Sequence, residues 1–213
     1  MNILIVGTNG KNGLVLVQQA SELGHVVTAV VHHEPKPTMQ GVRILQGDVR
    51  DPQFIESAIV GQQAIINTIG TRQPFLKTTL ETDAARRLID TMCCHRIRRI
   101  VAVSSTGVGD SIAYVRGLYR VLMPGFPRAI PDREGMEAQI RNTDLDWTIV
   151  RPAGFTDGLQ TNAAQIVTPD LHRRVRRIAR ADVAAFILNH IADVNVYRAV
   201  VGLTTQVCVK RSF

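Results

Sequence analysis

A glycine-rich turn begins at the seventh residue, and it limits the possible folds more than any other feature of the chain. The turn reads Gly7-Thr8-Asn9-Gly10-Lys11-Asn12-Gly13 and follows a continuous apolar run, Asn2 to Val6. Residues Lys11 to Leu23 then carry apolar side chains at helical spacing, and Gly24 ends the pattern. Glycines between a strand and a helix let the backbone approach a pyrophosphate, which the helix N-terminus stabilises. The turn therefore predicts a dinucleotide site; the alternative is a plain tight turn.

Five further apolar runs alternate with helical patterns along the chain. The runs are Val26–Val31, Val42–Leu45, Ala64–Ile69, Ile100–Val103 and Trp147–Val150, and the helical patterns cover Thr79–His95, Arg133–Asn142 and Asp182–Ile191. Short strands that are apolar on both faces and separated by helices form a parallel sheet covered on both sides. The sequence predicts an α/β fold, a doubly wound parallel sheet of the Rossmann type, as a single domain over 1–213. A small substrate-side region is expected over about 153–213, with strand-like pieces at Gln165–Thr168, Arg198–Val201 and Gln206–Val209 and Asp182 as a helix N-cap.

The charge balance is basic. The chain has 25 Lys and Arg against 18 Asp and Glu, for a net charge of +7. This suggests an anionic partner, which could be a nucleic acid, a membrane surface or a phosphate-bearing ligand. The densest basic run is Arg173-Arg174-Val175-Arg176-Arg177, and it could be solvated surface, a surface that steers an anionic substrate, or a nucleic-acid patch. No aromatic residues interleave with it, which disfavours nucleic acid.

The compartment is predicted to be the cytoplasm. No apolar run reaches the roughly 18 residues that a membrane span needs, and the N-terminus lacks the basic region of a signal peptide. The three cysteines, Cys93, Cys94 and Cys208, have no metal-ligand spacing and are expected to be reduced, buried thiols. We therefore expect no membrane partner and no metal, and a monomer or a weak homo-oligomer.

The end of the second apolar run bears on the choice of dinucleotide. It continues into His32-His33-Glu34-Pro35-Lys36, with no acid directly after the strand. A site that prefers NADH places Asp or Glu there to hold the ribose 2′-hydroxyl. His32, together with Lys11 of the glycine turn, could instead meet a 2′-phosphate. The sequence favours NADPH, and NADH is the alternative if Glu34 binds the ribose.

Three more segments follow apolar runs at the edge where ligands bind in such sheets. Gly47-Asp48-Val49 is expected beside the adenine, unless Asp48 only starts the next turn. Gly70-Thr71-Arg72 is expected over the nicotinamide ribose and the pyrophosphate. Ser104-Ser105-Thr106 is expected to face the reaction site, unless these hydroxyls only cap the following turn.

Together with the runs Asp146–Pro152 and Ala179–Ala184, these segments resemble the atypical short-chain dehydrogenase/reductases with an NAD(P)H-binding domain, over essentially the whole chain. Within that family the chain is similar to the biliverdin reductase B or flavin reductase group, on Gly70-Thr71-Arg72, Thr78-Thr79 and Ser105. The resemblance implies hydride transfer from NADPH to flavins (FMN, riboflavin) or to biliverdin-type tetrapyrroles. It also implies that Ser105 is the active-site serine, that Ser104 and Pro152 lie at the cofactor, and that solvent protonates the product.

The chain departs from the wider family at its catalytic pair. That family uses Tyr-x-x-x-Lys, in which the lysine lowers the pKa of the tyrosine. Here Leu118 follows Tyr114 and Met123 follows Tyr119 at that spacing. The usual alcohol or ketone dehydrogenation is therefore disfavoured. The rival interpretation is a non-catalytic NAD(P)-sensing regulatory protein, similar to the nitrogen-metabolite-repressor branch.

Overall fold

The computed structural model describes residues 1–33, 40–71, 76–114, 130–167 and 175–206. For residues 112–114 it describes the backbone alone. Its centre is an eight-stranded sheet, whose spatial order is β3 (Val42–Gln46), β2 (Val26–Val31), β1 (Asn2–Val6), β4 (Ala64–Asn67), β5 (Arg99–Val103), β6 (Asp146–Pro152), β10 (Ala199–Thr205) and β8 (Ala164–Ile166). Neighbouring strands run parallel, except that β8 pairs antiparallel with β10. The predicted doubly wound sheet is confirmed.

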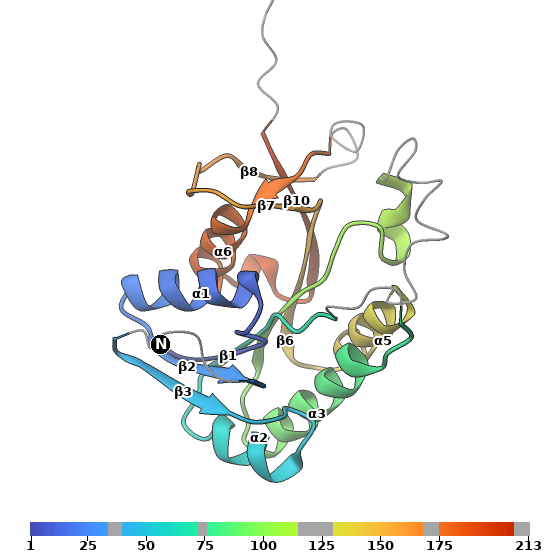
Figure 1. Cartoon of the computed structure of the whole chain (residues 1–213). Helices are drawn as coiled ribbons and strands as arrows, with labels where there is room; N and C mark the ends of the chain where they lie inside the picture. The colour runs from blue at the N-terminus through green and yellow to red at the C-terminus, as the bar shows by residue number, and fades with distance from the viewer. Residues whose placement is uncertain (34–39, 72–75, 115–129, 168–174, 207–213) are drawn as a thin grey trace, which may run out of the picture.

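Helices cover both faces of this sheet (Figure 1). One layer holds α1 (Lys11–Glu22) and α6 (Arg180–Asn189), and the other holds α2 (Pro52–Ile59), α3 (Leu80–Cys94) and α5 (Ile130–Arg141). Two short strands, β7 (Phe155–Thr156) and β9 (Ile178–Ala179), form a separate parallel pair.

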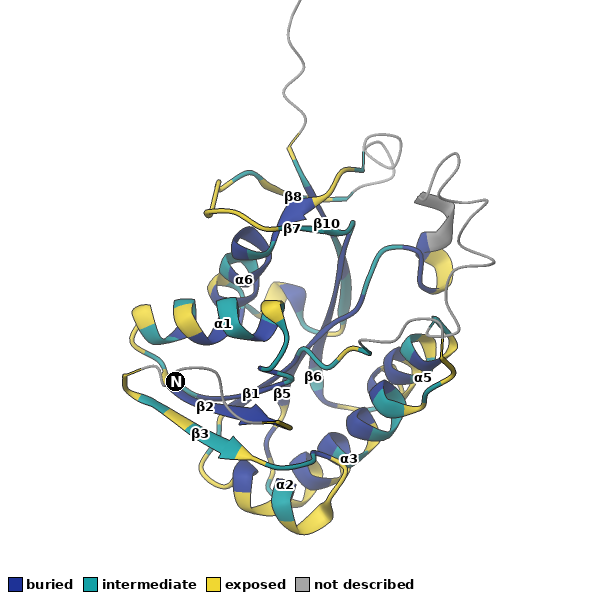
Figure 2. Ribbon diagram, viewed as in Figure 1, coloured by how far each residue is buried: buried dark blue, intermediate teal, exposed yellow. Residues whose placement is uncertain are grey.

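The sheet separates two hydrophobic cores. Side chains alternate along β1, so Leu4 and Val6 pack with α2, α3 and α5, whereas Ile3 and Ile5 pack with α1 and α6. Figure 2 shows the inner strands buried along their length and the helices exposed only on their outer sides. Strands buried on both faces explain why the sequence carried continuous apolar runs instead of alternating ones.

Most predicted elements appear within one or two residues of their expected bounds. Gly24 has a φ of +78°, which ends α1 as expected. The helix α2 was not predicted; it begins at Pro52, and the Asp51 carboxylate accepts a hydrogen bond from the Gln53 amide. The strand predicted at 198–201 appears as the first part of β10, which continues to Thr205; the piece predicted at 206–209 lies outside the described ranges except for Gln206.

Two local expectations are corrected. Asp182 is not the N-cap of α6, because Ala179 occupies that position. The Asp182 carboxylate is instead buried and accepts hydrogen bonds from the backbone amides of Thr161 and Asn162. Cys93 and Cys94 are exposed free thiols at the end of α3, not buried ones, and Cys208 lies outside the described residues.

Among the helices that the structure describes, none combines the length and the apolar character needed to cross a bilayer.

Candidate functional site

The glycine turn packs directly against the segment after β4. Gly7 has a φ of +84°, and a Cβ there would lie 2.7 Å from the backbone nitrogen of Ile69. A Cβ on Gly13 would lie 2.6 Å from the Cα of Thr8. Contacts this short leave no space for any side chain. The sequence therefore needs glycine at both positions to place the start of α1 at the carboxyl end of β1.

The N-terminus of α1 offers free donors to an anion. Its N-cap is Gly10, which supplies no side-chain hydrogen bond, and the first turn contains no acidic residue. Uncapped amides and a partial positive charge are what a pyrophosphate needs. The residues present thus fit a dinucleotide, and Gly7, Gly10 and Asn12 would hold its middle part.

A groove of about 970 Å³ runs along the carboxyl edge of the sheet from this turn. Most of the predicted cofactor residues line it: Gly7, Asn9, Gly10, Lys11, Asn12, His32, Asp48, Val49, Gly70 and Thr71. The structure thus brings together residues that are up to 64 positions apart, from Gly7 to Thr71. Arg72 lies outside the described ranges. Thr8, Gly13, Ser104, Ser105 and Pro152 are described but are not among the lining residues.

Three of these five have other contacts beneath or beside the groove. Thr8 is buried, and its hydroxyl donates to the carbonyl of Val30, 2.7 Å away. Ser104 is buried and donates to Glu137, while Pro152 is buried and its carbonyl accepts from the Thr106 amide. These residues support the groove from below, and their side chains do not form its wall.

One end of the groove carries the residues expected at the adenosine. The side-chain oxygen of Asn9 accepts hydrogen bonds from the amides of His32 and His33, at 2.7 and 3.2 Å. This ties the glycine turn to the end of β2. The His32 Nε2 atom lies 3.6 Å from the Asp48 carboxylate.

Arg50, which the sequence analysis missed, completes this end. Its guanidinium forms a bidentate ion pair with Asp48, with a shortest N–O distance of 2.6 Å. These hydrogen bonds from Arg50 lower the pKa of Asp48 to about 2, so the carboxylate is ionised at neutral pH. The signal was available, since Arg50 follows Asp48 by two residues. The adenosine end therefore has a half-exposed guanidinium besides the imidazole of His32.

The middle of the groove has a second ion-pair cluster. Lys11 Nζ lies 2.7 Å from the Asp157 carboxylate, which also pairs with Arg180 of α6. Lys11 and Arg180 both line the groove. The hydrogen bond from Lys11 holds the pKa of Asp157 below its usual range. In this structure Lys11 is therefore directed at the region after β7 and not at His32.

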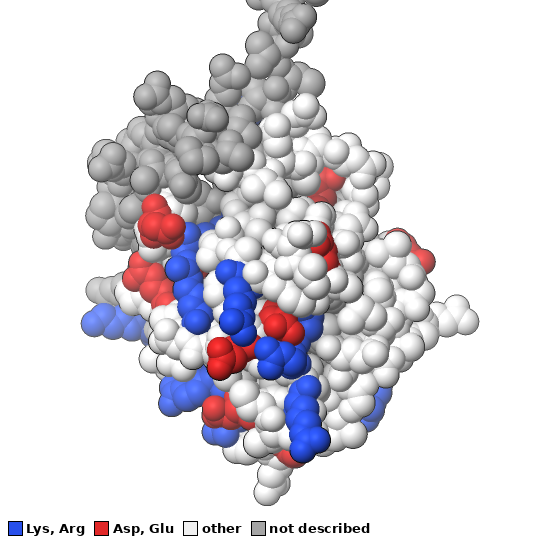
Figure 3. Space-filling view, turned by 180° about the vertical axis from the view of Figure 1, so that it is seen from behind, with Lys and Arg blue, Asp and Glu red and all other residues white. Residues whose placement is uncertain are grey.

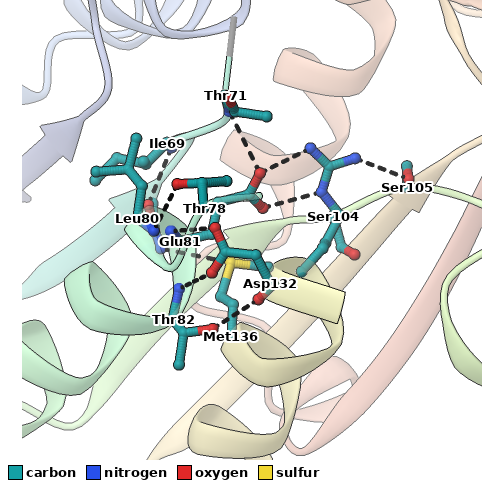
Figure 4. Close-up of polar contacts among 12 residues, drawn as sticks. Ile69, Thr71, Thr78, Leu80, Glu81, Thr82, Ser104, Ser105, Asp132 and Met136 are labelled. Atoms are coloured by element: carbon teal, nitrogen blue, oxygen red, sulfur yellow. Dashed lines mark hydrogen bonds and ion pairs between the residues drawn. The ribbon is translucent and has the colours of Figure 1, made fainter. Parts of the chain in front are cut away.

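At the other end of the groove, Arg133 of α5 connects Glu81 of α3 to Ser105 (Figure 4). Its Nε and Nη2 atoms each lie 2.9 Å from a Glu81 oxygen, and its Nη1 atom lies 3.1 Å from the Ser105 hydroxyl. Glu81 is fully buried, and it also accepts a hydrogen bond from the Thr71 amide. Burial alone would lower the pKa of Arg133, but its hydrogen bonds with Glu81 raise it. The sequence does not point to this cation, because the catalytic pair of the wider family is a tyrosine and a lysine.

A buried ion pair lies beneath Ser104. Glu137 and Arg151 are each 4% exposed, and the closest N–O distance between them is 2.6 Å. Arg151 also reaches the exposed Asp110, and Arg141 reaches Glu137. The Ser104 hydroxyl donates to Glu137 at 2.6 Å. The end of β5 is thus fixed against α5 by charge-assisted hydrogen bonds.

The arginine-rich run 173–177 is described only from residue 175. Arg176 and Arg177 are exposed, and the Arg177 guanidinium donates to the carbonyl of Phe155. On the face shown in Figure 3, basic and acidic side chains are interspersed and do not form a single basic surface.

The fold and this groove define an NAD(P)H-binding oxidoreductase. A model of the NAD(P)H-binding family matches residues 7–194, so the chain belongs to that family. The chain is 28% identical to the Bacillus subtilis (strain 168) protein YwnB over 173 residues, which is 78% of each chain. It is 26% identical to the photosystem II assembly factor Ycf39 of Trieres chinensis, covering 75% of this chain and 47% of that relative. The chain thus spans about half the length of Ycf39.

Among solved structures, the anaerobillin reductase ChuY from Escherichia coli O157:H7 superimposes with a TM-score of 0.78. The two chains are 26% identical, and the match covers 96% of this chain and 97% of ChuY. The fold and the family that the sequence predicted are therefore confirmed.

Proposed function

We propose that this protein is an NAD(P)H-dependent reductase that transfers hydride to flavins such as FMN and riboflavin, to biliverdin-type tetrapyrroles, or to both. The observation that carries the proposal is the continuous groove from the uncapped α1 N-terminus to the Arg133–Ser105 contact. The similarity to ChuY, a bilin reductase by its name, over nearly the whole chain supports the acceptor class. The proposed location is the cytoplasm, and the proposed state is a monomer or a weak homo-oligomer.

In this proposal the dinucleotide supplies the hydride, and the protein supplies binding and position. The pyrophosphate would be held by the turn Gly7–Gly13, with Lys11 nearby. The adenosine would be held by His32, Asp48, Val49 and Arg50, and the nicotinamide half by Gly70, Thr71 and Arg72. Ser105 would act at the acceptor side. The region over 153–213 contributes Arg180 to the groove wall, and Asp157 is its ion-pair partner.

We propose NADPH as the preferred cofactor, because two basic side chains, His32 and Arg50, lie where a 2′-phosphate is expected. We expect Arg50→Gln to raise the Kd for NADPH by about tenfold, the effect of one charge-assisted hydrogen bond. The Kd for NADH should change by less than about threefold. Fluorescence titration of both nucleotides measures this. Arg98→Gln, which removes an exposed arginine paired with Asp146 at the start of β6, is the control and should change neither Kd. Equal losses for the two nucleotides would contradict the assignment.

The proposed reaction is tested directly on the full chain. The absorbance of NADPH is followed with FMN and, separately, with biliverdin. We expect oxidation of NADPH with at least one acceptor, well above the rate without protein. Tight NADPH binding with no turnover of either acceptor would overturn the proposal.

Tight NADPH binding without turnover would favour a sensor that binds NAD(P) and acts on a protein partner. The observation in its favour is the relative Ycf39, which is named as an assembly factor.

A further inference from the structure

We infer that Arg133 binds the carbonyl oxygen of the hydride acceptor, and that Ser105 is a positioning residue that acts by orienting the Arg133 guanidinium. This inference rests on the proposed function and deepens it, because it assigns the acceptor-side group and the class of acceptor.

Access to the groove distinguishes the two residues. Arg133 is among the described residues that line the groove, and Ser105 is not. The Arg133 side chain is 25% exposed. The Ser105 hydroxyl accepts from the Arg133 Nη1 atom at 3.1 Å, its only hydrogen bond among the described residues. A molecule in the groove therefore meets the guanidinium before the hydroxyl.

The guanidinium is held in place and still has donors to spare. Three of its five N–H groups are used, by the two oxygens of Glu81 and by Ser105. The remaining two, one on each terminal nitrogen, have no acceptor within the described part of the chain. Two N–H groups on one planar guanidinium suit an oxygen atom that lies in the plane of a conjugated ring.

The backbone beneath Arg133 is fixed as well. The neighbouring Asp132 is buried, and its carboxylate accepts the amides of Glu81 and Thr82 at 3.0 and 2.8 Å. It thereby caps the start of α3 from the start of α5, as Figure 4 shows. Arg133 and its partner Glu81 are thus held in register, which is the preorganisation that charge stabilisation requires.

The charge of the pair indicates which oxygen would bind. Glu81 is fully buried and neutralises Arg133, so the pair has little net charge. Such a pair suits a neutral carbonyl that gains negative charge during the reaction. Flavins and bilins both carry carbonyls conjugated to the position that accepts hydride.

The proposed reaction is a hydride transfer. The hydride leaves the reduced nicotinamide with two electrons and forms a bond to the acceptor ring. The negative charge then spreads onto the conjugated oxygen, where Arg133 donates hydrogen bonds. A proton from water completes the reduced product.

The test uses the full chain, with riboflavin and FMN as probes. Their Kd values are measured without nucleotide, by quenching of flavin fluorescence, and kcat is measured with NADPH. We expect Arg133→Lys to raise both Kd values and lower kcat by at least tenfold. Ser105→Ala should lower kcat by less than tenfold. The double variant should match Arg133→Lys, because Ser105 acts through Arg133.

Arg141→Lys is the matched control, since Arg141 lies on the same helix, is paired with a buried glutamate and does not line the groove. It should change none of these values. If Arg133→Lys folds poorly by circular dichroism, Arg133→Met combined with Glu81→Gln removes both charges together. That double variant should show the same loss.

Three results would overturn the inference while leaving the proposed function intact. They are additive losses in the Ser105/Arg133 double variant, a loss for FMN but not for riboflavin, and a kcat loss of several orders of magnitude for Ser105→Ala. If the unmodified protein neither binds nor reduces flavins or biliverdin, the proposed function fails, and this inference fails with it.

Discussion

Gly7→Ala is expected to raise the Kd for NADPH by at least a hundredfold. The alanine Cβ would lie 2.7 to 2.9 Å from the backbone of Thr68 and Ile69, and these atoms cannot move without shifting the end of β4. The turn would therefore be displaced from the position in which it presents the first amides of α1. Titration of NADPH against the folded variant measures the loss.

Gly24→Ala is the matched control for this substitution. Gly24 has nearly the same φ, +78°, but a Cβ there would meet nothing within 4 Å. It should lose about 1–2 kcal/mol of stability from backbone strain alone and bind NADPH normally. Gly10→Ala, with its Cβ 3.3 Å from the Gly7 carbonyl oxygen, should give an intermediate affinity. Binding by Gly7→Ala within threefold of the parent protein would show that the turn does not hold the nucleotide.

The second large effect concerns stability. Glu137→Gln is expected to lower the free energy of unfolding by about 3 kcal/mol, since it leaves the charge of Arg151 without its buried partner. This expected loss lies at the low end of the range for breaking a buried ion pair, because the glutamine can still accept a hydrogen bond and Asp110 remains near Arg151. Urea unfolding followed by circular dichroism measures the change.

Glu134→Gln on the same helix provides the comparison. Glu134 is exposed, and its side chain accepts one hydrogen bond, from the Gly109 amide. We expect its free energy of unfolding to change by at most about 0.5 kcal/mol. A loss below about 1 kcal/mol for Glu137→Gln would mean that water or nearby groups replace the missing charge.

The central strands and the glycine turn were predictable because their signals are local. The apolar run of β1, the turn and the helical spacing of α1 lie within 23 consecutive residues. The helix α2 was missed because its eight residues are too few for a clear period. Only the first part of β10 was predicted, because Gly202 interrupts its apolar run at a position where Val167 packs closely.

The nucleotide half of the groove could also be predicted, since its residues follow strands that end at one edge of the sheet. The acceptor half could not. Arg133 and Glu81 are 52 positions apart, and Arg133 and Ser105 are 28 apart. No pattern in the sequence pairs them; the packing of α3 against α5 does. The same holds for Ser104, whose hydroxyl is directed into a buried ion pair that only the folded chain assembles.

The two cores on opposite faces of the sheet separate the two tasks of the groove. The helix that would hold the pyrophosphate, α1, is anchored in the core with α6, whereas Glu81 and Arg133 stand on α3 and α5 in the other core. Substitutions that repack the α3–α5 side can therefore reshape the acceptor end without moving the nucleotide end. A lineage built on this fold can change what it reduces while inheriting its cofactor site intact.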